Sequence, residues 1–169
     1  MLGLLPCQAG EVRWNDRPVH DPSTFFVPPR SAFTPQVPRL FSERLRDNVL
    51  LGLEDDDTTV AAALRAAVMD EDVAAFERGL DTLVGPRGVK LSGGQAQRAA
   101  AARMFVREPE LLVFDDLSSA LDATTESALW ARLFARGHDV TCLVVSHSPI
   151  ALARADRVLV LEDGRVTER

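Results

Sequence analysis

The chain has 169 residues, 46% of them hydrophobic and 26% charged, and a formal net charge of −6. This composition is typical of a single globular domain, and the acidic balance argues against nucleic acid as a partner. The longest apolar runs, at residues 140–145 and 158–161, are too short to span a bilayer, so we expect any membrane role to act through a partner.

The first half of the chain predicts a hairpin, a loop-like segment and then helices. Residues 10–19 favour a hairpin, because an alternating segment is followed by Asn15-Asp16, a pair that tolerates positive φ. Residues 21–38 contain five prolines, which favours a loop or an extended edge and disfavours a helix. Apolar residues at helical spacing predict helices over residues 41–53, 58–69 and 71–80. We interpret the acidic group at 70–72 as a solvated turn or helix start.

The second half alternates strands and helices. Helices are predicted over residues 95–106, 121–135 and 150–155. The apolar runs at 111–114 and 140–145 predict strands buried on both faces, and residues 157–161 predict a third strand. This alternation indicates an α/β fold with a parallel sheet. The helix-rich, strand-free stretch before it predicts an α-helical insertion.

The strongest local signal is Leu91-Ser92-Gly93-Gly94-Gln95 at the start of a predicted helix. Glycines let an anion approach the backbone, and the free N–H groups of a helix start point at it. Ser92 could hydrogen-bond a phosphate oxygen or simply cap the helix, so an ordinary loop-to-helix junction is the competing interpretation.

Polar side chains follow three extended segments. Asp115 and Asp116 end the buried run at 111–114, where ligands of parallel sheets bind and where a carboxylate suits Mg²⁺. His147 follows the next strand, and Gln36 follows Thr34-Pro35. Two acids at a turn, a lone histidine and a single glutamine are each weak evidence on their own.

Taken together, these motifs resemble the ATP-binding cassette (ABC) family. In that comparison residues 91–95, continued by Gln97 and Arg98, are the signature; 111–115 is the Walker B strand; and 119–122 is the D-loop. His147 matches the switch histidine and Gln36 the Q-loop glutamine. The resemblance implies a P-loop NTPase-like (RecA-like) parallel sheet with an inserted helical subdomain. It divides the chain into a first part of the ATP-binding core with the Q-loop at 1–40, a helical signature subdomain at 41–95, and the second half of the core at 96–169.

The resemblance also implies a mechanism, with ATP and Mg²⁺ as cofactors. Two such domains form a head-to-tail dimer around two ATP molecules, bound to the transmembrane domains of a transporter at the cytoplasmic face of the membrane. Asp115 and Gln36 would hold Mg²⁺, Asp116 would position the attacking water, and His147 would stabilise the γ-phosphate. The partner's ATP would be contacted by a further set: Ser92, Gly93, Gly94, Gln95 and Asp122.

Two departures from the family pattern affect this expectation. The sequence has no Gly-Lys pair, so the P-loop G-x-x-x-x-G-K-[ST] is not present, and the only lysine, Lys90, precedes the signature. We therefore expect the chain to start inside the domain, with the sheet incomplete at its N-terminal end and little activity or stability alone. The second departure is Asp116, where the family usually has Glu.

The loop at residues 82–88 resembles the one by which exporter cassettes touch their transmembrane domains, although Pro86 stands where exporters typically have Glu. An exporter ATPase subunit is the first reading. The alternatives are a non-catalytic partner that donates its signature to another subunit's ATP site, a decayed gene fragment, and a soluble cassette acting on DNA or translation. The exporter-like loop and the acidic charge argue against the last.

Overall fold

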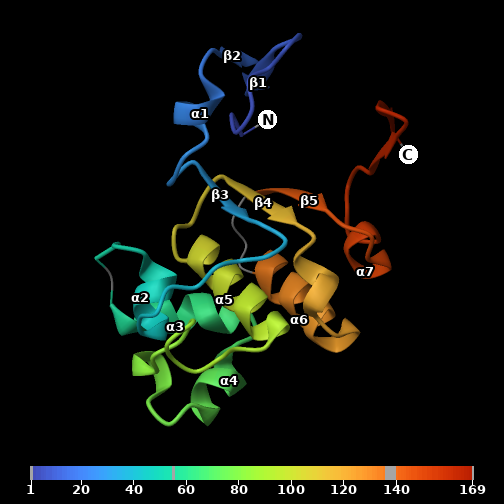
Figure 1. Ribbon diagram of the computed structural model, residues 1–169. Coiled ribbons are helices and arrows are strands. Elements are labelled where there is room, and N and C mark those ends of the chain that lie inside the picture. The colour runs from blue at the N-terminus through green and yellow to red at the C-terminus, as the bar shows by residue number, and fades with distance from the viewer. Residues whose placement is uncertain (1, 55, 136–139, 169) are drawn as a thin grey trace.

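A parallel sheet lies over a layer of helices (Figure 1). The computed structural model describes residues 2–54, 56–135 and 140–168. The sheet contains β3 (Ser31–Thr34), β4 (Leu111–Asp115) and β5 (Thr141–Val145), with β4 in the middle. Both strand pairs are parallel, and Phe114 stands beside Thr34 on one side and Val144 on the other. The expected α/β class with a parallel sheet is confirmed.

The strands differ in burial as their positions in the sheet require. Residues 111–114 of β4 are buried, as predicted for a strand covered on both faces. The same prediction for β5 is wrong, because β5 lies at the edge of the described sheet and Val145 is 55% exposed. β3 is the extended edge that the proline-rich segment allowed. That segment also forms α1 (Pro22–Phe25), one helical turn that we had excluded; Asp21 caps it and Pro22 fits its first position.

The predicted hairpin forms from β1 (Val12–Trp14) and β2 (Arg17–Val19), with positive φ at Asn15 and Asp16 as expected. Together with α1 it lies on the sheet face opposite the main helical layer (Figure 1). Val12, Trp14 and Val19 pack there against a small cluster of buried side chains, Phe26, Leu111 and Val113.

The helices of the other face follow the prediction; most are shorter than expected, while the helix that carries the signature begins at residue 93, two residues earlier. They are α2 (Leu45–Leu50), α3 (Asp57–Ala66), α4 (Asp70–Ala75), α5 (Gly93–Phe105) and α6 (Ala123–Phe134). The helix expected from residue 41 begins only at 45, because the Asn48 amide binds both the N–H and the C=O of Phe41 and so holds this segment in a loop. The helix expected over 71–80 breaks after α4 into a 3₁₀ turn, η1 (Gly79–Asp81), since Phe76 is extended and Gly79 has positive φ.

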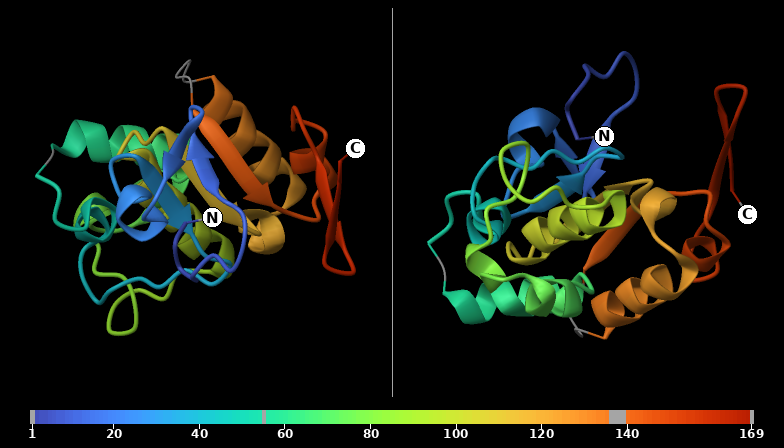
Figure 2. Two further views of the ribbon diagram at one scale, coloured as in Figure 1. Left: turned by 90° about the horizontal axis from the view of Figure 1, so that it is seen from above. Right: turned by 60° about the horizontal axis from the view of Figure 1, so that its bottom comes forward.

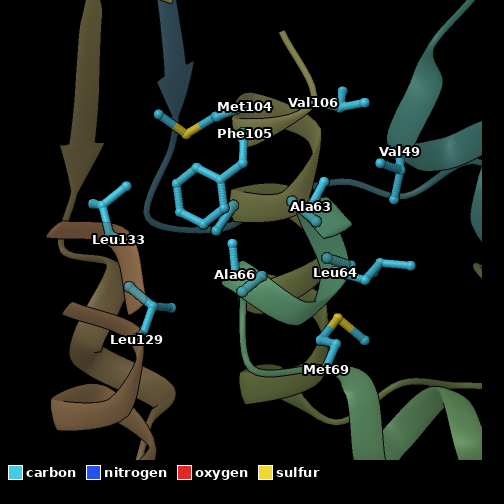
Figure 3. Packing of buried hydrophobic residues seen from close by; sticks show 14 of the residues in the cluster. Val49, Ala63, Leu64, Ala66, Met69, Met104, Phe105, Val106, Leu129 and Leu133 are labelled. Carbon is cyan, nitrogen blue, oxygen red and sulfur yellow. The ribbon is translucent and has the colours of Figure 1, made fainter. Parts of the chain in front are cut away.

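The main core lies where α3, α5 and α6 meet beneath the sheet (Figure 3). Phe105 of α5 and Trp130 of α6 both make edge-to-face contacts with Phe114 of β4, at centroid distances of 6.4 and 5.4 Å. Each fully buried large apolar side chain stabilises the fold by roughly 1.5–3 kcal/mol. This packing fixes α5, whose first turn is the signature motif, against the strand that ends in Asp115.

The C-terminal elements stand apart from the sheet (Figure 2). After α7 (Pro149–Leu152), β6 (Leu159–Glu162) pairs antiparallel with β7 (Arg165–Glu168) in a separate hairpin. The strand predicted at 157–161 therefore forms, but it does not join the parallel sheet among the residues that the structure describes. Leu159, Leu161 and Val166 are exposed on this hairpin.

Candidate functional site

The signature motif forms a complete capping box at the start of α5. The Ser92 hydroxyl accepts a hydrogen bond from Gln95 N at 3.2 Å, and the side-chain amide oxygen of Gln95, Oε1, accepts one from Ser92 N at 2.9 Å. Both interactions satisfy donors that a helix start leaves unpaired. The hydroxyl proton of Ser92 is not used in this box, so it can still donate to an anion in front of the helix.

The two signature glycines pack against the turn that follows β4. A Cβ atom on Gly94 would lie 2.7 Å from the carbonyl oxygen of Ala120, and one on Gly93 would lie 3.3 Å from the Ala120 Cβ. Ala120 ends the 3₁₀ turn η2 (Leu117–Ala120). Glycine at position 94 is therefore required by packing within this chain, whatever it also does for a ligand.

The Gln95 side chain is tied to α4. Its Nε2 donates to one oxygen of Asp72 at 2.8 Å, while Arg98 Nη2 lies 3.0 Å from the other oxygen. Arg98 also donates to the carbonyl oxygen of Val68 at 2.6 Å. The side chains of Arg98 and Asp72 are only 14% and 17% exposed. The acidic group at 70–72 does start a helix, but Asp72 is not solvated as we had read it, because this ion pair buries it.

The carboxyl end of β4 carries the predicted acidic pair. Asp115 is the last residue of the strand, and Asp116 adopts a left-handed conformation with φ 50° and ψ 47°. Asp116 N donates to Val145 O at 2.9 Å, which fixes the turn against β5. A non-glycine residue in this region is uncommon, and Asp is among the few side chains that tolerate it. Such strained residues are concentrated at functional sites.

Gln36 and Asp116 come together although 80 residues separate them. Gln36 Nε2 donates to Asp116 Oδ2 at 3.1 Å. The contact follows from the topology, because Gln36 follows β3 and Asp116 follows β4, and these strands are parallel neighbours. The sequence singled out both residues separately, and the structure shows that they lie at the same edge of the sheet.

His147 lies at the same edge, after β5, with an exposed side chain. The residue before it, Ser146, has its hydroxyl 3.2 Å from that of Ser118 in the turn η2. This contact holds the segment that carries His147 against the segment that follows Asp116. Among the described residues, no hydrogen bond joins His147 to Gln36 or to Asp116.

Asp122 caps α6. Its carboxylate accepts from the N–H groups of Thr124 and Thr125 at 3.1 and 3.0 Å and from the Thr125 hydroxyl at 2.7 Å. The Thr125 hydroxyl, followed by the Thr125 N–H, lowers the pKa of Asp122 below its ordinary value of 3.8. Its side chain is exposed, so a surface role can coexist with the cap.

The oxygen atoms at this edge are of the chemical type that Mg²⁺ binds. Asp115 and Asp116 supply carboxylates and Gln36 supplies an amide oxygen, and Mg²⁺ usually binds one or two carboxylates together with waters and phosphate oxygens. Within the described ranges no three His, Cys, Asp or Glu side chains gather into an all-protein metal site. The donors therefore fit a magnesium ion that arrives with a phosphate ligand better than a permanently caged metal.

Sequence reasoning missed two residues that organise this region, Asp72 and Gln97. Asp72 stood inside an acidic run that resembles any solvated helix start, so no local signal marked it. Gln97 was noted as part of the signature's continuation but received no role, and only the structure shows its partners on Gln36 and Ser119.

A protein-family model described as "ABC transporter" matches residues 1–119. The chain belongs to the ABC transporter family. The ABC relatives it resembles include an "ATP-dependent lipid A-core flippase" of Burkholderia orbicola (strain AU 1054), which is 40% identical over 151 residues. That match covers 89% of this chain and 26% of the flippase. An "ABC multidrug transporter MDR2" of Trichophyton interdigitale (strain MR816) is 39% identical over 140 residues, 81% of this chain and 10% of the relative.

A solved structure shows the same domain architecture. It is described as a bacterial Atm1-family ABC exporter with ATP bound, and it matches with a TM-score of 0.85 and 30% identity. The match covers 95% of this chain and 28% of that one. The chain is thus an ABC exporter ATP-binding domain that spans about a quarter of the length of the flippase and of the Atm1-family exporter, and 10% of the multidrug transporter. None of its described helices has the length and apolar character needed to cross a bilayer.

Proposed function

We propose that this domain binds and hydrolyses ATP and so powers an ABC-type membrane exporter. The observation that carries the proposal is the contact of the Gln36 amide with the Asp116 carboxylate at 3.1 Å. It unites residues from two parallel strands at the edge where such sheets bind ligands. A capped helix with a glycine start stands beside this edge, because Gly94 packs on Ala120.

The residues at the carboxyl edge would act on ATP held by the same subunit. Asp115 and Gln36 would hold Mg²⁺, which neutralises phosphate charge when bound. Asp116 would orient the attacking water, and its contact with Gln36 would fix the direction of its carboxylate. His147, exposed after β5, would donate to the γ-phosphate.

The signature would act on ATP held by a second domain in a head-to-tail dimer. Ser92 would donate its free hydroxyl proton to a phosphate oxygen, and the N–H groups of Gly93 and Gly94 would face the same anion. Gln95 would support this contact through the capping box. Asp122, exposed at the start of α6, would meet the opposing domain.

We assign the proposed roles to three successive parts of the chain. Residues 1–40 and 96–169 would form the ATP-binding core, and 41–95 the helical signature subdomain. Residues 82–88 would bind the transmembrane domains, which would hold this domain at the cytoplasmic face of the membrane. The exporter relatives support this arrangement.

The test measures ATP hydrolysis by the exporter assembly that contains this chain. Asp116→Asn keeps the side-chain shape and an oxygen for Gln36 but cannot accept a proton or orient water as a carboxylate does. We expect kcat to fall by about 10²–10³-fold, the size of effect seen when one transition-state interaction is lost. An unchanged kcat would contradict the assignment of Asp116.

The second candidate, a signature donor without catalysis of its own, is favoured by the capping box, which is complete within this chain. Ser92→Arg separates the two. If Ser92→Arg abolishes hydrolysis and Asp116→Asn does not, the chain serves only its partner's ATP. If both variants abolish it, the domain is catalytic as proposed.

A further inference from the structure

Gln97 is a buried polar residue on the signature helix whose partners belong to two other functional segments. It lies in the second turn of α5, and it is 3% exposed. Its Nε2 donates to the Gln36 backbone oxygen at 3.3 Å and to the Ser119 hydroxyl oxygen at 3.0 Å. One side chain thus joins the signature helix, the segment after β3 and the turn after β4.

These hydrogen bonds continue into a closed ring. The Ser119 hydroxyl donates to the Asp116 carbonyl oxygen at 2.9 Å, and the Gln36 amide donates to the Asp116 carboxylate. The ring therefore runs from Gln97 through Ser119 to Asp116, and returns through Gln36 to Gln97. Every hydrogen bond in the ring has a defined donor. The Gln97 amide donates both of its hydrogens, and the Ser119 hydroxyl donates its hydrogen to the Asp116 carbonyl oxygen.

The remaining atom of Gln97 shows that this arrangement costs stability. Its Oε1 is buried and has no hydrogen-bond partner. An unpaired buried acceptor is unfavourable, and an apolar side chain of the same shape would avoid it. Both partners of Gln97 belong to residues that are exposed overall, at the edge where the site lies. The unpaired oxygen is a cost that an apolar side chain would not carry, which points to a role of this glutamine in the site.

We propose that Gln97 is a positioning residue that ties the signature helix to the Gln36–Asp116 pair. The inference rests on the proposed function, in which the signature serves the partner's ATP and Gln36 and Asp116 serve this chain's own. If α5 moved when the signature bound the partner's ATP, the hydrogen bonds of Gln97 would transmit that movement to Gln36 and to the turn after Asp116. Gln97 would link the two ATP sites within one chain.

Gln97→Met tests this link, with Thr34→Val as the matched control. Both substitutions replace a buried hydrogen-bonding side chain by an apolar one of similar shape. Thr34 also joins β3 to α5, through Ala100 O, but it lies outside the ring. Hydrogen–deuterium exchange of the full chain would be followed in peptides covering residues 36–40 and 116–121. Melting temperature, kcat and KM for ATP would be measured for the exporter assembly.

We expect Gln97→Met to speed exchange in both peptides and to leave the melting temperature no lower than the wild type's. Its kcat should fall by about 10–10²-fold, as for a misplacement on the order of 1 Å, with KM little changed. Thr34→Val should show neither the faster exchange nor the fall in kcat. Ser119→Ala opens the ring from its exposed side and should add no further loss to Gln97→Met.

Unchanged exchange in both peptides would overturn the inference, and so would the same changes in Thr34→Val. A wild-type assembly that hydrolyses no ATP would overturn the proposed function instead, and the exchange measurement would still decide the role of Gln97.

Discussion

At the scale of single residues, Asp116 combines a strained backbone with a shortened side chain. Its left-handed φ of 50° turns the chain after β4, and its N–H is fixed by Val145. Its carboxylate meets Gln36 directly. The family usually has Glu here, one C–C bond longer, or ~1.5 Å. The aspartate thus holds its carboxylate closer to the backbone than a glutamate would, and in the proposed function a glutamate would reach farther towards the attacking water.

The Asp116→Glu substitution should consequently raise ATP turnover. Misplacing a catalytic group on the order of 1 Å can cost about 10²-fold in rate, so a gain of about tenfold or more in kcat is expected. The measurement is steady-state ATP hydrolysis by the complete assembly, with Glu77→Asp, an exposed change outside the proposed site, as the control. Equal or lower turnover in Asp116→Glu would show that the shorter acid suits this site.

At the scale of elements, the signature helix α5 is held in place by side-chain contacts with α4. One carboxylate oxygen of Asp72 accepts a hydrogen bond from Gln95, and the other forms an ion pair with Arg98, so Asp72 holds the first turns of α5 in place. Arg98 also donates to the backbone oxygen of Val68, in the connection between α3 and α4. The orientation of the signature therefore depends on a helix of only six residues.

Asp72→Ala should release this lock. It removes a charge-assisted hydrogen bond and leaves the poorly exposed Arg98 without its carboxylate, so a loss of about 1–3 kcal/mol in the free energy of unfolding is expected. Urea denaturation of the full chain measures it. Glu71→Ala, an exposed acid in the same turn, should change stability by no more than about 0.5 kcal/mol. Equal effects of the two substitutions would refute the lock.

The elements that the sequence predicted well carry their signal locally. The buried run of β4 and the capping residues of α5 needed no distant partner to be recognised, whereas the contact of Gln36 with Asp116 was found only in the structure. The predictions that were wrong concern features that depend on tertiary contacts. The apolar run of β5 does not reveal that it lies at an edge, β6 pairs with β7 instead of the main sheet, and Asp72 depends on an arginine 26 positions later.

At the scale of the whole molecule, carboxylates hold several helices in place. Asp56 caps α3, where the Thr59 N–H is the main cause of its lowered pKa. Asp122 caps α6, where the Thr125 hydroxyl is the main cause. Asp70 accepts a hydrogen bond from Arg132, which lowers its pKa and joins α4 to α6. All three have pKa values below the ordinary 3.8, so each binds its proton less readily in the folded chain.

The downward direction of these pKa shifts determines how stability depends on pH. Groups with a lowered folded pKa stabilise the fold fully above the unfolded value, about 3.8, and lose that contribution as the pH falls through the folded value. The melting temperature should respond little to these groups between about pH 5 and 8 and should drop below about pH 4. Asp56→Asn with Asp122→Asn keeps oxygen caps that cannot titrate, so the drop should be shallower in this variant. A drop of the same depth in both proteins would mean that other carboxyl groups govern the acid transition.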